Sequence, residues 1–205
     1  ETEVFRMLKK LLLYVIAILS SFLFVACSQD FEIVKVPNDV SLDFAFIECM
    51  GQSLDEVCDH LGIADDAVKE TNQIGKYVLT PSMKYHGIEF VHYLTFSQNP
   101  QALYGGGYEC FIKDKGAPLT ETVTALKTML TEAYGAPTTE PALSNTIGEK
   151  NDFSDCVAGT TLLERWTVAG EHPGDIQLLL EFREEEVYVQ AEYRITVPAQ
   201  RPNAN

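Results

Sequence analysis

The sequence predicts an α+β fold in which a mainly antiparallel sheet has two helices packed on one of its faces. Three segments, 88–96, 176–182 and 187–195, alternate their residues with the period of two that half-buried strands show. Two others, at about 54–61 and 120–134, repeat apolar residues every three or four positions and are followed by glycine. Each element has one apolar side, and these sides can be buried only against each other.

The motif SLDE at 53–56 indicates the start of the first helix. Ser53 can cap it, and Glu56, three residues later, can accept a hydrogen bond from the Ser53 backbone amide and so complete a capping box. Gly62 is expected to end the helix in the left-handed conformation. The predicted apolar stripe consists of Leu54, Val57, Cys58 and Leu61.

The second helix is expected over about 120–134. Gly135 ends it, and Pro137 prevents the helix from restarting. Its predicted apolar face consists of Val123, Leu126, Leu130 and Ala133.

The strands divide into strong and weak patterns. The turn REEE between 176–182 and 187–195 predicts that these two strands form a hairpin. The segment 170–175 is predicted to be a turn, and 138–160 is predicted to be mostly loop. Weaker strand patterns are found at 44–49, 76–80, 108–112 and 163–168.

The two halves of the chain have a similar order of elements. A helix that ends at a glycine is followed by strands in each half, and Gly135 lies 73 residues after Gly62. GIEFVHYLTF in the first half aligns with DIQLLLEF in the second, and LYGGGYE aligns with VYVQAEY. We therefore predict a single α+β domain over 41–197, either without internal repetition or with two α-β-β-β repeats, 41–115 and 116–197, that arose by an old duplication or are two similar α+β modules in succession.

Residues 1–27 have the three parts of a secretory signal, with Met7 as the expected start and ETEVFR upstream of it. Lys9 and Lys10 form the positive end, and the apolar run over 11–26 follows. That run has 16 residues, fewer than the about 20 that a membrane-spanning helix needs. An uncleaved anchor helix and an ordinary secretion signal with a chance cysteine are the alternatives.

This leader resembles the bacterial lipoprotein (type II) signal peptide, in which a short run of apolar and small residues, the lipobox, ends in a cysteine. The resemblance makes Cys27 the residue that is linked to diacylglycerol when the chain is cut before it. The lipobox would be Phe24, Val25 and Ala26, with Phe24 where Leu is the most frequent residue. The resemblance implies a lipid-anchored protein of the bacterial cell envelope.

The residues after the cysteine refine this location. Ser28 stands where Asp retains many lipoproteins in the inner membrane, which favours the outer membrane, facing the periplasm or the cell surface. Residues 28–40 show little periodicity and are expected to be a tether, and 198–205 is expected to be a disordered tail.

The layout of 44–197 also resembles small α+β envelope lipoproteins. The stretch LTEAYGAP before a Trp-bearing strand and a final hairpin is similar to uncharacterised lipoproteins of gut bacteria. In broad outline the layout is similar to the tandem modules of beta-lactamase-inhibitor-protein-like proteins. This second resemblance implies a fold and assigns no catalytic residue.

The charge of the chain limits its partners. It has 15 basic and 30 acidic residues and a net charge of −15. An acidic body repels phosphate backbones, so nucleic-acid binding is not expected, and it also repels anionic membranes, which leaves the lipid on Cys27 as the membrane contact. Surface solvation accounts for the charge without a partner, and a basic protein partner in the envelope or loosely held cations are alternatives.

Four cysteines follow Cys27, and outside the cytoplasm they could form two disulfides with three possible connectivities. There is no CxxC motif, and Cys58 with His60 alone does not make a zinc site, so no metal and no cofactor are expected. Cys58 is also suited to be a buried thiol on the first helix. The four are Cys49, Cys58, Cys110 and Cys156.

Catalytic motifs are missing from the sequence: there is no G-x-S-x-G, H-E-x-x-H, Walker or EF-hand pattern. YGGGY at 104–108 lacks a following Lys-Ser/Thr and lies away from a helix start, which predicts a flexible turn or a bulge instead of a phosphate-binding loop. His92 and Cys110 could form a nucleophilic pair, but His92 lies on the apolar side of its strand, where a core histidine is expected. The carboxylates show no glycosidase spacing.

The outward positions of the strands predict a surface. Four of them are apolar or aromatic, and if their strands are neighbours they form a patch that could bind a partner, unless a loop such as 138–160 covers it. These four candidate binding residues are Val91, Tyr93, Leu179 and Tyr188.

Together these observations predict a lipid-anchored, non-catalytic binding, adaptor or inhibitory module. A structural lipoprotein that supports the assembly of other envelope proteins and an envelope hydrolase of unusual type are the alternatives.

Overall fold

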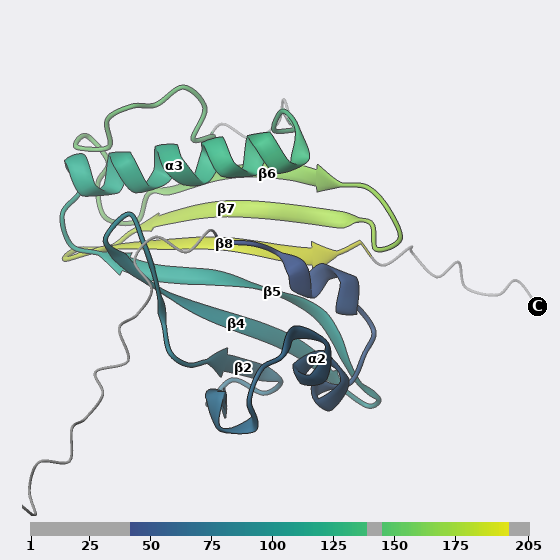
Figure 1. Ribbon diagram of the computed structural model, residues 1–205. Helices are drawn as coiled ribbons and strands as arrows, with labels where there is room; N and C mark the ends of the chain where they lie inside the picture. Colours follow the sequence, from purple (N-terminus) through teal and green to yellow (C-terminus); the bar gives the residue numbers. More distant parts are fainter. Residues whose placement is uncertain (1–41, 139–144, 197–205) are drawn as a thin grey trace, which may run out of the picture. The chain divides into compact units, whose positions relative to one another are not determined.

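The computed structural model describes residues 42–138 and 145–196 of the chain. The predicted signal peptide and lipobox, Cys27, the tether over 28–40 and the tail over 198–205 lie outside these described residues. The predicted α+β fold is confirmed: the strands form one antiparallel sheet, and two α-helices pack against it (Figure 1).

In the described part of the chain the sheet has eight strands, of which seven follow the order β1-β2-β4-β5-β8-β7-β6, while β3 pairs with β4. Every pair of neighbouring strands is antiparallel. The strands are β1 (Val68–Glu70), β2 (Lys76–Leu79), β3 (Met83–Tyr85), β4 (Ile88–Gln98), β5 (Gln101–Ile112), β6 (Thr161–Val168), β7 (Gly174–Phe182) and β8 (Val187–Ile195).

The first helix, α2 (Leu54–Leu61), forms as its motif predicts. The Ser53 side chain accepts a hydrogen bond from the Glu56 amide at 3.4 Å, and the Glu56 carboxylate accepts one from the Ser53 amide at 2.8 Å. Gly62 ends the helix in the left-handed conformation at φ 65°. The capping box and the glycine stop are therefore confirmed.

The second helix, α3 (Ala117–Tyr134), begins three residues earlier than predicted and ends before Gly135 as expected. Pro118 stands in its first turn, where a missing amide hydrogen has no cost. Val123, Leu126 and Leu130 are buried, as predicted. Ala133 is exposed in the last turn, so its assignment to the apolar face is wrong.

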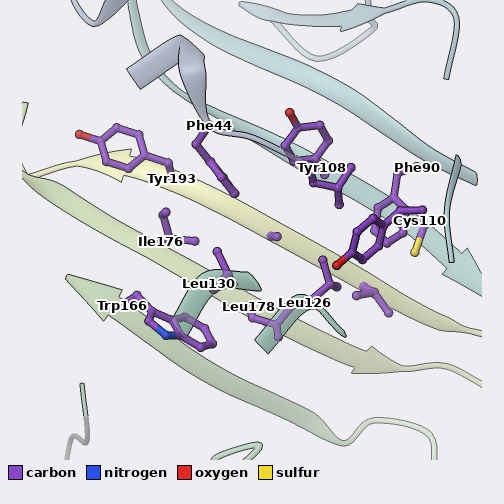
Figure 2. Packing of buried hydrophobic residues seen from close by; sticks show 14 of the residues in the cluster. Phe44, Phe90, Tyr108, Cys110, Leu126, Leu130, Trp166, Ile176, Leu178 and Tyr193 are labelled. Atoms are coloured by element: carbon purple, nitrogen blue, oxygen red, sulfur yellow. The ribbon is translucent and has the colours of Figure 1, made fainter. Parts of the chain in front are cut away.

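One face of the sheet carries both helices and the core. In the central strands β4, β5, β8 and β7, alternate residues with matched registers point to this face. Figure 2 shows Leu130 of α3 on the side of Trp166 of β6, Leu126 of α3 beside Leu178 of β7, and Phe44 near Tyr108 of β5. Val57 of α2 belongs to the same buried cluster. We call this side of the sheet the helix face and the opposite side the open face.

The segment 44–49 was predicted to be a weak strand, and this prediction is wrong. Ala45–Cys49 forms a short 3₁₀ helix, η1, that lies on the helix face. Phe46 packs against His92 with 5.7 Å between ring centroids and against Tyr193 with 6.3 Å. The segment is apolar and buries Phe44, Phe46 and Cys49 at once, which a strand lying at a sheet edge would not do.

The YGGGY stretch does not form a turn, so that prediction is wrong as well, because Gly105–Gly107 lie inside β5. The alternative of a bulge is confirmed, because the register between β4 and β5 shifts beside Tyr104. A Cβ atom at Gly107 would lie 2.1 Å from the Ala191 carbonyl oxygen of β8. Glycine is therefore required where β5 and β8 approach each other.

The two halves have the same order of elements. A helix precedes antiparallel strands in each half, five (β1 to β5) in the first and three (β6 to β8) in the second, and the last strand of the first half, β5, pairs with the last strand of the second, β8. A second 3₁₀ turn, η2 (Asp65–Ala67), and the short strands β1 and β3 occur in the first half alone among the described elements. The tandem repeat stays a prediction, because element order by itself does not test common ancestry.

We predict that Gly107→Ala strongly destabilises the fold. The new methyl group would collide with backbone atoms of Ala191 and Glu192, which cannot move without separating β5 from β8. We expect a loss of at least about 3 kcal/mol in the free energy of unfolding, as for severe backbone strain. Urea unfolding followed by fluorescence of Trp166, the single tryptophan, measures it.

Gly116→Ala is the matched control. An added Cβ there meets a side-chain atom, Asp114 Oδ1, at 3.1 Å and no backbone atom. We expect the free energy of unfolding to change by no more than about 0.5 kcal/mol. Equal losses in the two variants would contradict the close strand approach at Gly107.

Candidate binding surface

The open face is built by the alternate residues that point away from the helices. Matched registers across the sheet place Val91, Glu109, Gln190 and Leu179 in one row, and place Tyr188 between Phe111 and Glu181 in a neighbouring row. All four predicted surface residues therefore lie on this face. Val91 and Leu179 are separated by the polar residues of two strands, so the four do not form one continuous apolar patch.

Tyr93 is on the open face but is buried, with 1% of its surface exposed. Its hydroxyl accepts a hydrogen bond from Gln190 Nε2 at 2.7 Å. Because β5 separates β4 from β8, the Tyr93 side chain must extend across β5, and its register partner there is Gly107. Burial and the nearby charge of Glu192 raise the pKa of Tyr93. Tyr93 is thus part of the floor of the surface and not an exposed contact.

A polar cluster joins three strands on this face. Lys76 Nζ lies 2.9 and 2.8 Å from the two carboxylate oxygens of Glu109, and the Tyr188 hydroxyl donates to Glu109 Oε2 at 2.6 Å. Lys76 Nζ also lies 4.1 Å from the centroid of the Tyr93 ring, within cation–π range. Burial and the bond to Glu109 raise the pKa of Tyr188, which therefore stays a hydrogen-bond donor.

An aromatic pair on the open face, exposed Phe111 and half-buried Tyr188, lies under an arginine. Phe111 is 51% exposed, and its ring centroid lies 5.2 Å from that of Tyr188. The Arg183 guanidinium lies 5.3 Å from the Phe111 ring and 5.0 Å from the Tyr188 ring. Phe111 was not among the predicted residues, although its alternation with Cys110 and Ile112 in YECFI would have placed it outward.

The loop 138–160 was the segment expected to cover this surface if it is not a binding site. In its described part, Ile147 and Phe153 are buried in the core of the helix face. Thr146 pairs with Leu163 at the edge of β6. The described part of the loop thus leaves the surface around Phe111 and Tyr188 open.

Charge is distributed unevenly over the molecule. The described residues include 24 acidic and 10 basic side chains, and the open face holds five acidic and six basic ones, which leaves 19 acidic and four basic elsewhere. The open face is therefore close to neutral on a strongly acidic protein. Its basic residues are Lys69, Lys76, Lys84, Arg165, Arg183 and Arg194, and its acidic residues are Glu89, Glu109, Asp175, Glu181 and Glu192.

His92 of β4 and Cys110 of β5 both lie on the helix face. The register partner of His92 is Tyr108, which stands two residues before Cys110. His92 stacks on Tyr108 with 4.6 Å between ring centroids, and its buried Nε2 has no hydrogen-bond partner within the described part of the chain. Burial lowers the pKa of His92 to about 4, against a smaller opposing effect of Asp43. Burial raises the pKa of Cys110 to about 12, so its sulfur is a thiol at neutral pH.

The other cysteines are free thiols as well, so the structure contains none of the three possible disulfide connectivities. Cys49 and Cys58 are buried, and Cys156 is half-buried. Over 42–138 and 145–196, no group of three or more His, Cys, Asp and Glu residues is placed to hold a metal ion. In the same ranges no helix is long and apolar enough to cross a membrane.

Comparisons with protein-family models, with curated proteins and with solved structures find no match to this chain.

We predict that His92 makes stability depend on pH between about 6.5 and 4. The unfolded chain protonates this imidazole near pH 6.5, whereas the folded protein does so near pH 4. The contribution of neutral His92 to the free energy of unfolding is fully present above about pH 6.5. It is lost as the pH falls to about 4, and it does not change further below that pH. The loss amounts to about 3 kcal/mol by linkage.

His92→Phe keeps a ring against Tyr108 and should flatten this dependence in urea unfolding measured at several pH values. His60→Gln, a change at a largely exposed histidine, is the control and should leave the wild-type slope unchanged. A wild-type slope in His92→Phe would show that other groups cause the effect.

Proposed function

We propose that this protein is a lipid-anchored protein of the bacterial cell envelope that acts without catalysis, as a binding, adaptor or inhibitory module for another envelope protein. The observation that carries the binding role is the open face, where exposed Phe111 lies against Tyr188 of the hydrogen-bonded floor and Arg183 lies over both rings. Aromatic residues and arginine provide most of the binding energy in many protein interfaces.

The floor of the surface supports this proposal. The Lys76–Glu109–Tyr188 cluster and the Gln190–Tyr93 bond hold their side chains in fixed positions before any partner arrives. Fixed side chains lose little conformational entropy on binding. The nearly neutral charge of the face also allows another acidic protein to approach it with less repulsion than elsewhere on the molecule.

The chemistry of the helix face supports a non-catalytic role. A nucleophilic cysteine needs a lowered pKa and a base within reach, whereas burial raises the pKa of Cys110. His92 is neutral and lies between Phe46 and Tyr108. We therefore favour the binding role over the alternative of an envelope hydrolase.

The lipid anchor rests on the leader sequence. Two or three acyl chains on Cys27 would hold the protein on a bilayer, because each buried methylene contributes about 0.8 kcal/mol. The acidic body would itself be repelled by anionic lipid, so the anchor would be the membrane contact.

We predict that Cys27→Ala abolishes membrane association. In cells grown with labelled palmitate, the wild-type protein should carry the label and sediment with the membranes. The variant should carry no label and lose its mature, lipid-bound form. Wild-type protein that takes up no palmitate and remains in the cytosol would contradict the proposed anchor.

We predict that the open face contacts a specific protein in the envelope. A photo-crosslinking residue, p-benzoylphenylalanine, placed at Phe111 should yield one dominant adduct in intact cells. The same residue at Val157, which is 69% exposed on the loop after α3, should yield at least about fivefold less of that adduct. Adding Arg183→Ala should reduce the yield at position 111, because it removes the cation above both rings.

No adduct from position 111, or equal yields from positions 111 and 157, would contradict the binding role of the open face. Fluorescence of Trp166 shows whether each variant is folded, so that a loss of contact is not mistaken for unfolding.

A further inference from the structure

A second concave region lies on the helix face at the β1–β2 end of the sheet, away from the open face. It consists of two cavities of about 290 and 350 Å³ that share Glu70 and Tyr77 in their walls. The smaller cavity lies along the end of the β4–β5 hairpin, and the larger lies between α2 and β1. We call the two cavities together the Tyr77 groove.

The hydrogen-bonding groups that line the groove are mainly side-chain amides and hydroxyls. Gln98, Asn99 and Gln101 line the smaller cavity around Tyr77, together with Ser97. Each amide offers two N–H donors and one carbonyl acceptor. Among the residues that the structure describes, no lysine, arginine or histidine lines either cavity. The groove can therefore exchange hydrogen bonds with a ligand in both directions, and it does not suit an anion.

The aromatic ring of the groove is held in place. Gln101 Nε2 donates to the Tyr77 hydroxyl at 3.2 Å, and the Tyr77 ring meets the Phe96 ring edge-on with centroids 5.5 Å apart. Tyr77 is half-buried, so part of its ring is accessible. A half-exposed ring with a fixed polar tip provides an apolar surface next to hydrogen-bonding groups.

The wall of the smaller cavity is formed before a ligand binds. The turn that precedes β2 is fastened to β4, because the Phe96 amide donates to the Gly75 carbonyl at 2.8 Å. A Cβ atom at Gly75 would lie 2.2 Å from the Phe96 carbonyl oxygen, and φ there is +75°. The Thr71 hydroxyl donates to the Lys76 carbonyl at 3.0 Å from inside the same turn. Sites of this preformed, concave kind are typical of small-molecule binding.

From these features we propose that the Tyr77 groove binds a neutral saccharide. A sugar ring presents C–H groups on a face, which can stack on the Tyr77 ring, and hydroxyls around its rim, which both donate and accept. Gln98, Asn99 and Gln101 match that rim, and the carboxylate of Glu70 can accept from two neighbouring hydroxyls. The larger cavity extends the site beyond one sugar unit. This proposal does not depend on the open face or on the lipid anchor.

The carboxylates of the larger cavity raise one competing possibility, a cationic ligand. Asp55, Asp65 and Glu70 line it without a basic residue. Acidic residues by themselves do not define a site, and the N–H donors of the amides in the smaller cavity would find no acceptor on a cation. The test therefore compares two ligands with the same sugar backbone and different charge.

The experiment titrates the full-length protein in detergent micelles with four neutral trisaccharides: maltotriose, cellotriose, mannotriose and chitotriose. Ligand-observed saturation-transfer NMR detects binding, and calorimetry gives Kd. We expect at least one of them to bind. The fully deacetylated, cationic form of chitotriose is the charge comparison. Binding of the cationic form without any neutral trisaccharide would overturn the proposal, as would no neutral binding up to about 10 mM.

Gln101→Leu removes the amide and keeps a side chain of similar size. It should weaken neutral saccharide binding at least about fivefold, as expected for the loss of a hydrogen bond and of the Tyr77 orientation. Gln177→Leu on the open face is the matched control and should leave Kd unchanged. Equal Kd values for the wild type and Gln101→Leu would place the sugar elsewhere and overturn the assignment. Phe111 variants should not alter sugar binding, which separates this proposal from that of the open face.

Discussion

The close approach of β5 and β8 at Gly105–Gly107 is the constraint on which the rest of the structure depends. These are the last strands of the two halves of the chain, and their pairing alone joins β1-β2-β4-β5 to β8-β7-β6. A Cβ atom at Gly105 would lie 2.8 Å from the Tyr193 carbonyl oxygen, and one at Gly107 would lie 2.1 Å from that of Ala191. Any side chain at these positions would push the strands apart and divide both the sheet and the core beneath it.

The same glycines shape both faces of the sheet. On the helix face, Gly106 lies against Phe46 of η1, and a Cβ atom there would approach the Phe46 ring to 3.1 Å. On the open face, the missing side chain at Gly107 leaves room for Tyr93 to reach Gln190 across β5. Cross-strand pairs of an aromatic residue with a glycine are a known way of protecting glycine in a strand. Backbone geometry at one point thus fixes the floor of the proposed binding surface.

Local patterns in the sequence were sufficient to predict the elements, and non-local contacts explain what they did not predict. The capping box at Ser53, the stop at Gly62 and the hairpin around REEE involve residues close in sequence, so pattern and propensity determine them. The 3₁₀ helix at 45–49 forms because Phe46 is buried against His92 and Tyr193, which are far away in sequence. The glycines were assigned to a turn or a bulge because the sequence does not show that β8 lies beside them. Glu109 and Tyr188 are 79 residues apart, so their hydrogen bond follows only from the β5–β8 register.

The charge pattern distinguishes the open face from an ordinary solvated surface. If acidic residues served solvation alone, they would be expected on every exposed side, yet the open face holds five acidic and six basic groups while the remaining described residues hold 19 acidic and four basic ones. Several of the charges on the open face are neutralised within it, as in Lys76–Glu109 and Arg194–Glu192, both at 2.8 Å. Ion pairs of this partly exposed kind contribute little to stability, and half-buried ones offset the cost of desolvation only when they are well bonded. Their clearest physical consequence is a nearly neutral surface with fixed donors and acceptors, where the proposed binding of another acidic protein would meet less repulsion than elsewhere on a protein with a net charge of −15.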